Sequence, residues 1–169
     1  MKRTTIEFMI GWLDALRRDD VDALKATLAR DVVWQGLRDE WTCQGPDAVI
    51  DTFAGERKAK REIGALELIG ADDHVVLHAS GGDIVAIEDV ALPDGIYNVF
   101  TLDAGRITRI DDYADRHEAL TAAALSDGAG RFFLLARLPS GEPVRAQLRR
   151  VSASELRRLF VVGVEGEDG

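Results

Sequence analysis

Five strand-like segments follow one another between residues 63 and 113, and this succession restricts the fold more than any other feature of the sequence. They are residues 63–70 (IGALELIG), 74–80 (HVVLHAS), 83–92 (DIVAIEDVAL), 96–102 (IYNVFTL) and 106–113 (RITRIDDY). The linkers between them are ADD, GG, PDG and DAG, which are short and typical of consecutive antiparallel hairpins. The sequence therefore predicts a mainly antiparallel sheet whose strands pair with their neighbours in the chain.

Three helix patterns precede these strands. The first begins at Thr4-Thr5-Ile6-Glu7, which has the form of a capping box, and continues with apolar residues at three- and four-residue spacing. The second follows Asp20, a good N-cap, and includes Leu24 and Leu28. The third opens at Gly45-Pro46, since proline is tolerated at the first helical position. With a strand at 31–36 (DVVWQG) between the last two, the order predicts an α+β fold with the helices on one face of a curved sheet.

The glycine-rich segment SDGAG, residues 126–130, divides the chain into two predicted units. Residues 1–126 form the main domain, and residues 127–169 form a small β-β-α-β extension. Residues 1–126 carry 14 Lys and Arg against 24 Asp and Glu, a net charge of −10, whereas residues 130–164 carry seven Arg against two Glu, a net charge of +5. An acidic domain repels phosphate backbones, so we expect no nucleic acid partner. We expect the basic extension to lie against acidic protein surface.

Several classes of protein lack support in the sequence. No apolar stretch approaches the roughly 20 residues of a membrane span and no signal peptide is evident, which predicts a cytoplasmic protein with no membrane partner. Phosphate-binding loops, nucleophile elbows and dinucleotide fingerprints are absent, so we expect no cofactor. His74 and His78 would lie about 13 Å apart along a strand, too far to share one ion, and we therefore expect no metal.

Two adjacent acids, Asp111 and Asp112, lie at the end of the last strand. The turn before this strand, residues 102–106 (LDAGR), suits a type I turn with Gly105 in a left-handed bulge position. This turn pairs Leu102 with Arg106. It also predicts three further opposed pairs: Phe100 with Thr108, Asn98 with Ile110, and Ile96 with Asp112.

This register separates the two acids, because alternate side chains of a strand lie on opposite faces of a sheet. Asp112 is predicted on one face, and Asp111 is predicted on the other together with Tyr97. The residues predicted on the Asp112 face are Ile96, Asn98, Phe100, Thr108 and Ile110. A slip by one residue would reverse the assignment.

Two segments of the sequence resemble a known family. The segments 8–36 (FMIGWLDALRRDDVDALKATLARDVVWQG) and 97–120 (YNVFTLDAGRITRIDDYADRHEAL) resemble the SnoaL-like group of the nuclear transport factor 2 superfamily, over about residues 5–125. The resemblance implies a strongly curved sheet that forms a cone around a central pocket, closed by the helices and often found in a dimer. That superfamily also includes ketosteroid isomerase and limonene epoxide hydrolase.

The resemblance implies roles for some residues and not for others. Asp112 matches the final-strand aspartate that polyketide cyclases and the epoxide hydrolase point into the cone, and Asn98 matches an oxyanion-hole aspartate of the isomerase. The isomerase's oxyanion tyrosine is matched by Trp12, and its proton-shuttling aspartate is matched by Gly36 or Gln35. The hydrolase's Arg-x-Asp unit corresponds to residues 87–89 (IED), which lack the arginine. Both of these activities are therefore disfavoured.

Two hypotheses of function remain open, and with them the question of whether the chain is an enzyme. In the first, the chain is a cofactor-independent cyclase, isomerase or lyase that uses Asp112 as a general base, because burial in an apolar site raises the pKa of a carboxyl group. Asn98 would donate a hydrogen bond to the enolate, and His78 would relay the proton. The ligand would be a small hydrophobic or ring-shaped molecule. Its predicted pocket consists of Trp12, Trp34, Phe53, Phe100 and Ile110. In the alternative, the chain is a non-catalytic ligand-binding or dimerisation module whose basic extension contacts a partner.

Overall fold

The computed structural model describes residues 5–58, 65–81, 84–125 and 131–134. The helices are α1 (Thr5–Arg17), α2 (Val21–Ala26), α3 (Pro46–Lys58) and α4 (Arg116–Ala122). The strands are β1 (Leu28–Gln35), β2 (Thr42–Gln44), β3 (Ala65–Ala71), β4 (His74–Ser80), β5 (Ala86–Ile87), β6 (Val90–Ala91), β7 (Ile96–Asp103), β8 (Arg106–Tyr113) and β9 (Arg131–Leu134). None of the helices described is long and apolar enough to cross a membrane.

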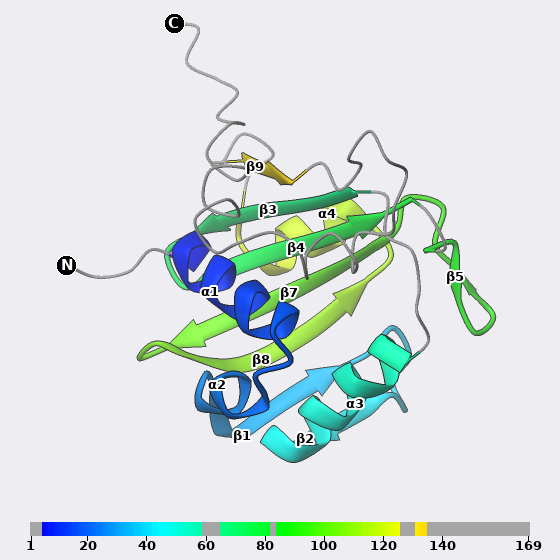
Figure 1. The fold of residues 1–169 in the computed structure, drawn as a ribbon. Coiled ribbons are helices and arrows are strands. Elements are labelled where there is room, and N and C mark those ends of the chain that lie inside the picture. The colour runs from blue at the N-terminus through cyan, green and yellow to red at the C-terminus, as the bar shows by residue number, and fades with distance from the viewer. Residues whose placement is uncertain (1–4, 59–64, 82–83, 126–130, 135–169) are drawn as a thin grey trace, which may run out of the picture.

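One mixed sheet contains seven of these strands, in the order β2-β1-β8-β7-β4-β3-β9. Its centre consists of four of the five predicted meander strands, because β3, β4, β7 and β8 pair antiparallel in succession. The pairing of β1 with β8 is parallel and joins the N-terminal part of the chain to the end of the meander. The α+β fold with N-terminal helices on the sheet is therefore confirmed (Figure 1).

The segment 83–92 differs from its predicted form as one strand of the meander. It contains two short strands, β5 and β6, which pair with each other in a separate two-stranded sheet. The chain reverses between them at Glu88, whose φ is +51°. Because this segment leaves the main sheet, β4 pairs directly with β7, so that His78 faces Tyr97.

The starts of α2 and α3 agree with their sequence signals, and the end of α2 does not; Thr4, the predicted cap of the first helix, lies outside the described residues. The carboxylate of Asp20 accepts a hydrogen bond of 3.0 Å from the backbone N–H of Ala23 and caps α2, as predicted. Pro46 is the first residue of α3, also as predicted. The prediction that Leu28 belongs to the second helix is wrong, since α2 ends at Ala26 and Leu28 begins β1.

Buried side chains form a separate cluster on each face of the sheet. The larger cluster lies between the sheet and the N-terminal helices and includes Met9, Trp12, Phe100 and Ile110. The smaller cluster packs β3, β4 and β7 against α4 and includes Leu120. Figure 1 shows α1, α2 and α3 in front of the sheet and α4 behind it. The candidate site residues therefore divide according to which cluster they face.

The C-terminal extension is represented in the described residues by β9. This strand pairs antiparallel with β3, with Leu134 opposite Leu66 and Arg131 opposite Ile69. The rest of the predicted β-β-α-β unit, residues 135–169, lies outside the described residues, and the division into two domains stays a prediction.

Candidate functional site

The turn between β7 and β8 sets the register of the strands that carry Asn98 and Asp112. Asp103 pairs with Arg106, and the two residues between them, Ala104 and Gly105, have φ angles of +47° and +76°. Positive φ at both central residues is characteristic of a two-residue type I′ turn. The predicted three-residue turn, which paired Leu102 with Arg106, is therefore wrong by one residue.

A β-bulge in β8 follows the turn, one residue pair further along the β7–β8 ladder. The register shifts between Thr101 and Leu102, which leaves Thr108 between Ile107 and Arg109 without an opposed residue. This bulge turns the fully buried Ile107, rather than the predicted Thr108, toward the larger core cluster. Beyond it Phe100 opposes Ile110.

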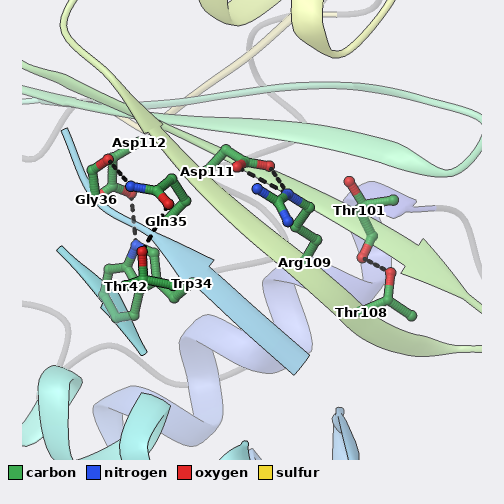
Figure 2. A network of polar contacts seen from close by, with 9 residues as sticks. All are labelled: Trp34, Gln35, Gly36, Thr42, Thr101, Thr108, Arg109, Asp111 and Asp112. Atoms are coloured by element: carbon green, nitrogen blue, oxygen red, sulfur yellow. Dashed lines mark hydrogen bonds and ion pairs between the residues drawn. The ribbon is translucent and has the colours of Figure 1, made fainter. Parts of the chain in front are cut away.

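Asn98 and Asp112 lie directly opposite each other as a result. The predicted pairs, Asn98 with Ile110 and Ile96 with Asp112, were wrong by two residues. Because a shift of two residues keeps every side chain on its face, the predicted sharing of one face by Asn98 and Asp112 agrees with the observed register. Asp111 lies on the other face, where its carboxylate accepts hydrogen bonds of 2.8 and 3.0 Å from Arg109 Nε (Figure 2). This contact raises the pKa of Arg109.

Two nitrogen donors from neighbouring strands converge on the carboxylate of Asp112. Asn98 Nδ2 on β7 donates a hydrogen bond of 2.6 Å to Asp112 Oδ1, and Trp34 Nε1 on β1 donates one of 2.9 Å to the same oxygen. Figure 2 shows the indole of Trp34 directed toward Asp112. Both donors are neutral, so they stabilise the ionised carboxylate without forming an ion pair.

An aromatic group adjoins this carboxylate through Trp34. The Trp34 ring lies 4.5 Å from the ring of Phe53, which in turn lies 5.0 Å from Trp12 in an edge-to-face arrangement. Trp12 also meets Phe100 edge to face at 5.5 Å. We call Trp12, Trp34, Phe53 and Phe100 the aromatic group. Its members come from α1, β1, α3 and β7, so it forms only when the helices pack on the sheet.

Exposure divides these residues into an inner and an outer set. Trp12, Trp34, Phe100 and Ile110 are buried, whereas Phe53, Asn98 and Asp112 are half-buried.

His78 does not join this arrangement. It pairs with Tyr97 across β4 and β7, and the two rings stack in parallel with centroids 4.0 Å apart. Its Nε2 lies 2.5 Å from the carbonyl oxygen of Asp94, and its Nδ1 lies 3.3 Å from Glu67 Oε2. Because Tyr97 lies on the face opposite Asn98, the prediction that His78 partners Asp112 is corrected: the sheet separates the two side chains.

A family model for the SnoaL-like domain matches residues 10–110. The chain belongs to the SnoaL-like domain family. The resemblance read from the sequence is thus confirmed at the level of the family. Among curated proteins, none matches the chain significantly in sequence.

Solved structures similar to this SnoaL-like chain include three bacterial proteins. A "putative polyketide cyclase" from Sinorhizobium meliloti is 24% identical with a TM-score of 0.48, covering 63% of this chain and 94% of its own. An NTF2-like protein of unknown function from Burkholderia pseudomallei is 18% identical with a TM-score of 0.49, covering 72% and 98%. A protein of ketosteroid isomerase-like fold from Catenulispora acidiphila, in complex with trimethylamine, is 22% identical with a TM-score of 0.44, covering 73% and 96%. These likenesses carry no information on activity.

Sequence reasoning missed two features of this SnoaL-like domain. The contact between Trp34 and Asp112 depends on the parallel pairing of β1 with β8, which joins residues far apart in the chain. The other is Glu67, a buried carboxylate held by Arg116 through hydrogen bonds of 2.9 and 3.1 Å on the face that carries His78. An acid at a buried position of an apolar strand, ALELIGA, was the available signal for this second feature.

Proposed function

We propose that this SnoaL-like chain binds a small hydrophobic or ring-shaped molecule beside the aromatic group and uses Asp112 as a general base. The observation that supports this most directly is the double hydrogen bond to Asp112 Oδ1, from Asn98 at 2.6 Å and from Trp34 at 2.9 Å. The donors hold the carboxylate in one orientation next to an apolar surface, as abstraction of a weakly acidic proton requires.

The proposed reaction is proton abstraction from a carbon next to a carbonyl group. The carboxylate of Asp112 takes the proton, the electron pair of the C–H bond forms the enolate double bond, and the negative charge develops on the carbonyl oxygen. An amide nitrogen carries two hydrogens, and the contact with Asp112 uses one hydrogen of Asn98. The second can donate to the enolate oxygen. The proton then returns to another atom of the same molecule, so the reaction needs no cofactor.

The aromatic group supplies the binding side of the proposal. Apolar and aromatic side chains with a few polar groups are the usual lining of a small-molecule site. Phe53 is half-buried and contacts both Trp12 and Trp34. A ring-shaped ligand against Phe53 would therefore be held near Trp34, which donates a hydrogen bond to Asp112.

The test uses 5-nitrobenzisoxazole, a carbon acid that opens to a coloured nitrophenolate when a base removes its proton. We expect the purified full chain to accelerate this reaction, and we expect Asp112→Asn to reduce the rate by about 100-fold or more. Asparagine keeps an oxygen that can accept from Trp34 and Asn98, so the variant preserves the contacts and loses the basicity. Asp111→Asn is the matched control on the opposite face and should keep the rate. Equal rates for the wild type and Asp112→Asn would reject the proposal.

A non-catalytic pocket is the second candidate, and one observation favours it. The carboxylate of Asp112 on β8 connects β1 and β7 through the hydrogen bonds from Trp34 and Asn98, which is also what a purely structural residue would do. Under this alternative the wild type does not turn over the probe, yet an aromatic ring compound such as 2-naphthol raises its melting temperature. Phe53→Ala should abolish that rise.

Assembly is a separate part of the proposal. We propose a homodimer, as the family resemblance implies, with the basic extension 127–169 contacting a partner. Sedimentation of the full chain at several concentrations tests the first part. A monomer at all concentrations would reject it.

A further inference from the structure

The indole of Trp34 is buried and has one hydrogen-bond donor. Trp34 as a residue is 8% exposed, so an unpaired indole N–H there would carry the full cost of desolvation. Asp112 Oδ1 accepts this N–H at 2.9 Å. The two residues meet because Trp34 pairs with Ile110 in the parallel β1–β8 ladder, and Asp112 lies two residues further along β8 on the same face.

The end of β1 next to Trp34 is held by contacts within the β1–β2 connection. Directly after Trp34, Gln35 Nε2 donates a hydrogen bond of 2.7 Å to the carbonyl of Arg38. Thr42 Oγ1 donates one of 2.8 Å to Gln35 Oε1 (Figure 2). The backbone N–H of Gly36 donates to the carbonyl of Trp41 at 2.6 Å. These contacts close the connection between β1 and β2 and fix where β1 ends.

The ring itself is held by packing. Phe53 of α3 lies against it at 4.5 Å with an interplanar angle of 34°. The indole N–H therefore points in a direction set by α3 and by the β1–β2 connection, and not by Asp112 alone.

We propose that Trp34 is a positioning residue for Asp112, fixing the orientation and the basicity of its carboxylate. This inference rests on the proposed role of Asp112 as a general base. A hydrogen bond to the charged form of an acid favours that form. Loss of the indole donor therefore makes the carboxylate bind protons more readily and leaves Asn98 as the one donor of the pair described above.

The first test is the pH profile of 5-nitrobenzisoxazole opening by Trp34→Phe. Phenylalanine keeps an aromatic ring against Phe53 and removes the N–H. We expect the acid limb of the profile to move upward by about one pH unit, the order of magnitude for one lost hydrogen bond to a carboxylate. We also expect a lower plateau rate, because the carboxylate is less well oriented. An acid limb in the same place as in the wild type would overturn the inference.

The second test reads the contact directly and needs no turnover. The chain has three tryptophans, so its ¹H–¹⁵N spectrum contains three indole signals. Trp12→Phe and Trp41→Phe assign the Trp34 signal by elimination, even if Trp34→Phe does not fold. We expect this signal to move with pH in the acidic range in the wild type and in Trp12→Phe. We expect the movement to be lost in Asp112→Asn.

The two tests separate this inference from the proposed function. A Trp34 signal that follows the titration of Asp112, in a chain that never opens the probe, would reject the proposed function and retain the coupling of the two side chains. If the chain opens the probe in a way that depends on Asp112, and the acid limb of the pH–rate profile is unmoved in Trp34→Phe, the positioning role alone is rejected. A Trp34 signal unaffected by Asp112→Asn would overturn the inference whatever the activity.

Discussion

Tyr97 is a residue whose chemistry is set by the face it occupies. It lies on the face opposite Asn98 and is buried beneath His78 and beside α4. Burial raises the pKa of Tyr97, with hydrogen bonding from Arg116 acting in the opposite direction. Tyr113, directly opposite Tyr97 across β7 and β8, also has a raised pKa because of burial. Neutral phenols are therefore favoured at both positions.

These shifts predict how stability depends on alkaline pH. A folded-state pKa above the unfolded value means that the folded chain holds its protons longer, so the contribution to stability is complete below about pH 10 and is lost as pH rises through the folded pKa. The chain has two tyrosines. Ultraviolet titration of the phenolate should show both ionising above the ordinary value, and Tyr113→Phe isolates Tyr97. Ionisation of Tyr97 at the ordinary value in the folded chain would contradict this assignment.

At the scale of the element, the turn that leads into β7 shows how a backbone position is constrained by a neighbouring strand. Gly95 has a φ of +86°, and a Cβ there would lie 2.1 Å from the carbonyl oxygen of Ala79 in β4. Gly105, between β7 and β8, also has a positive φ of +76°, but a Cβ there would meet no atom within 4 Å. Both positions require a left-handed conformation, and at Gly95 there is also no room for a side chain.

This difference predicts unequal costs for the same substitution. Gly105→Ala should lower the free energy of unfolding by about 1 to 2 kcal/mol, the cost of a left-handed alanine. Gly95→Ala should cost about 3 kcal/mol or more, because β4 and β7 must also move apart. Urea unfolding of the two variants measures both values. Equal destabilisation would show that the approach of Gly95 to β4 is not restrictive.

At the scale of the whole molecule, the sheet separates two cores, and the smaller one depends on a single helix. The first residue of α4, Arg116, reaches across to the buried Glu67 of β3 and makes a two-point contact of 2.9 and 3.1 Å. His78 of β4 lies 3.3 Å from the same carboxylate. An ion pair of this kind is costly to break from one side, because the remaining charge stays buried.

Arg116→Met should therefore lower the free energy of unfolding by about 2 to 3 kcal/mol. The double variant Glu67→Gln with Arg116→Met should cost less than the sum of the two single variants, since it leaves no buried charge unpaired. Urea unfolding of all three variants completes the cycle. Additive costs would show that the pair is not coupled energetically.

Local signals in the sequence predict the order of the elements and the faces of individual strands. Capping at Asp20, the start of α3 at Pro46 and the hairpins β3–β4 and β7–β8 all follow from signals within a few residues. Asp112 and Asn98 were predicted on one face although their register was wrong by two residues, because side chains alternate with a period of two and such an error leaves the face unchanged.

The features that the sequence does not predict depend on contacts between distant segments. The apolar pattern of residues 83–92 gave no sign that the chain reverses at Glu88 and leaves the main sheet. The sequence also did not show that His78 and Asp112 lie on opposite faces of the sheet, because this depends on the register of β4 against β7. The hydrogen bond from Trp34 to Asp112 requires β1 to pair in parallel with β8, and nothing local encodes that choice. Local periodicity specifies which way a side chain points, whereas the packing of the whole chain specifies what it meets.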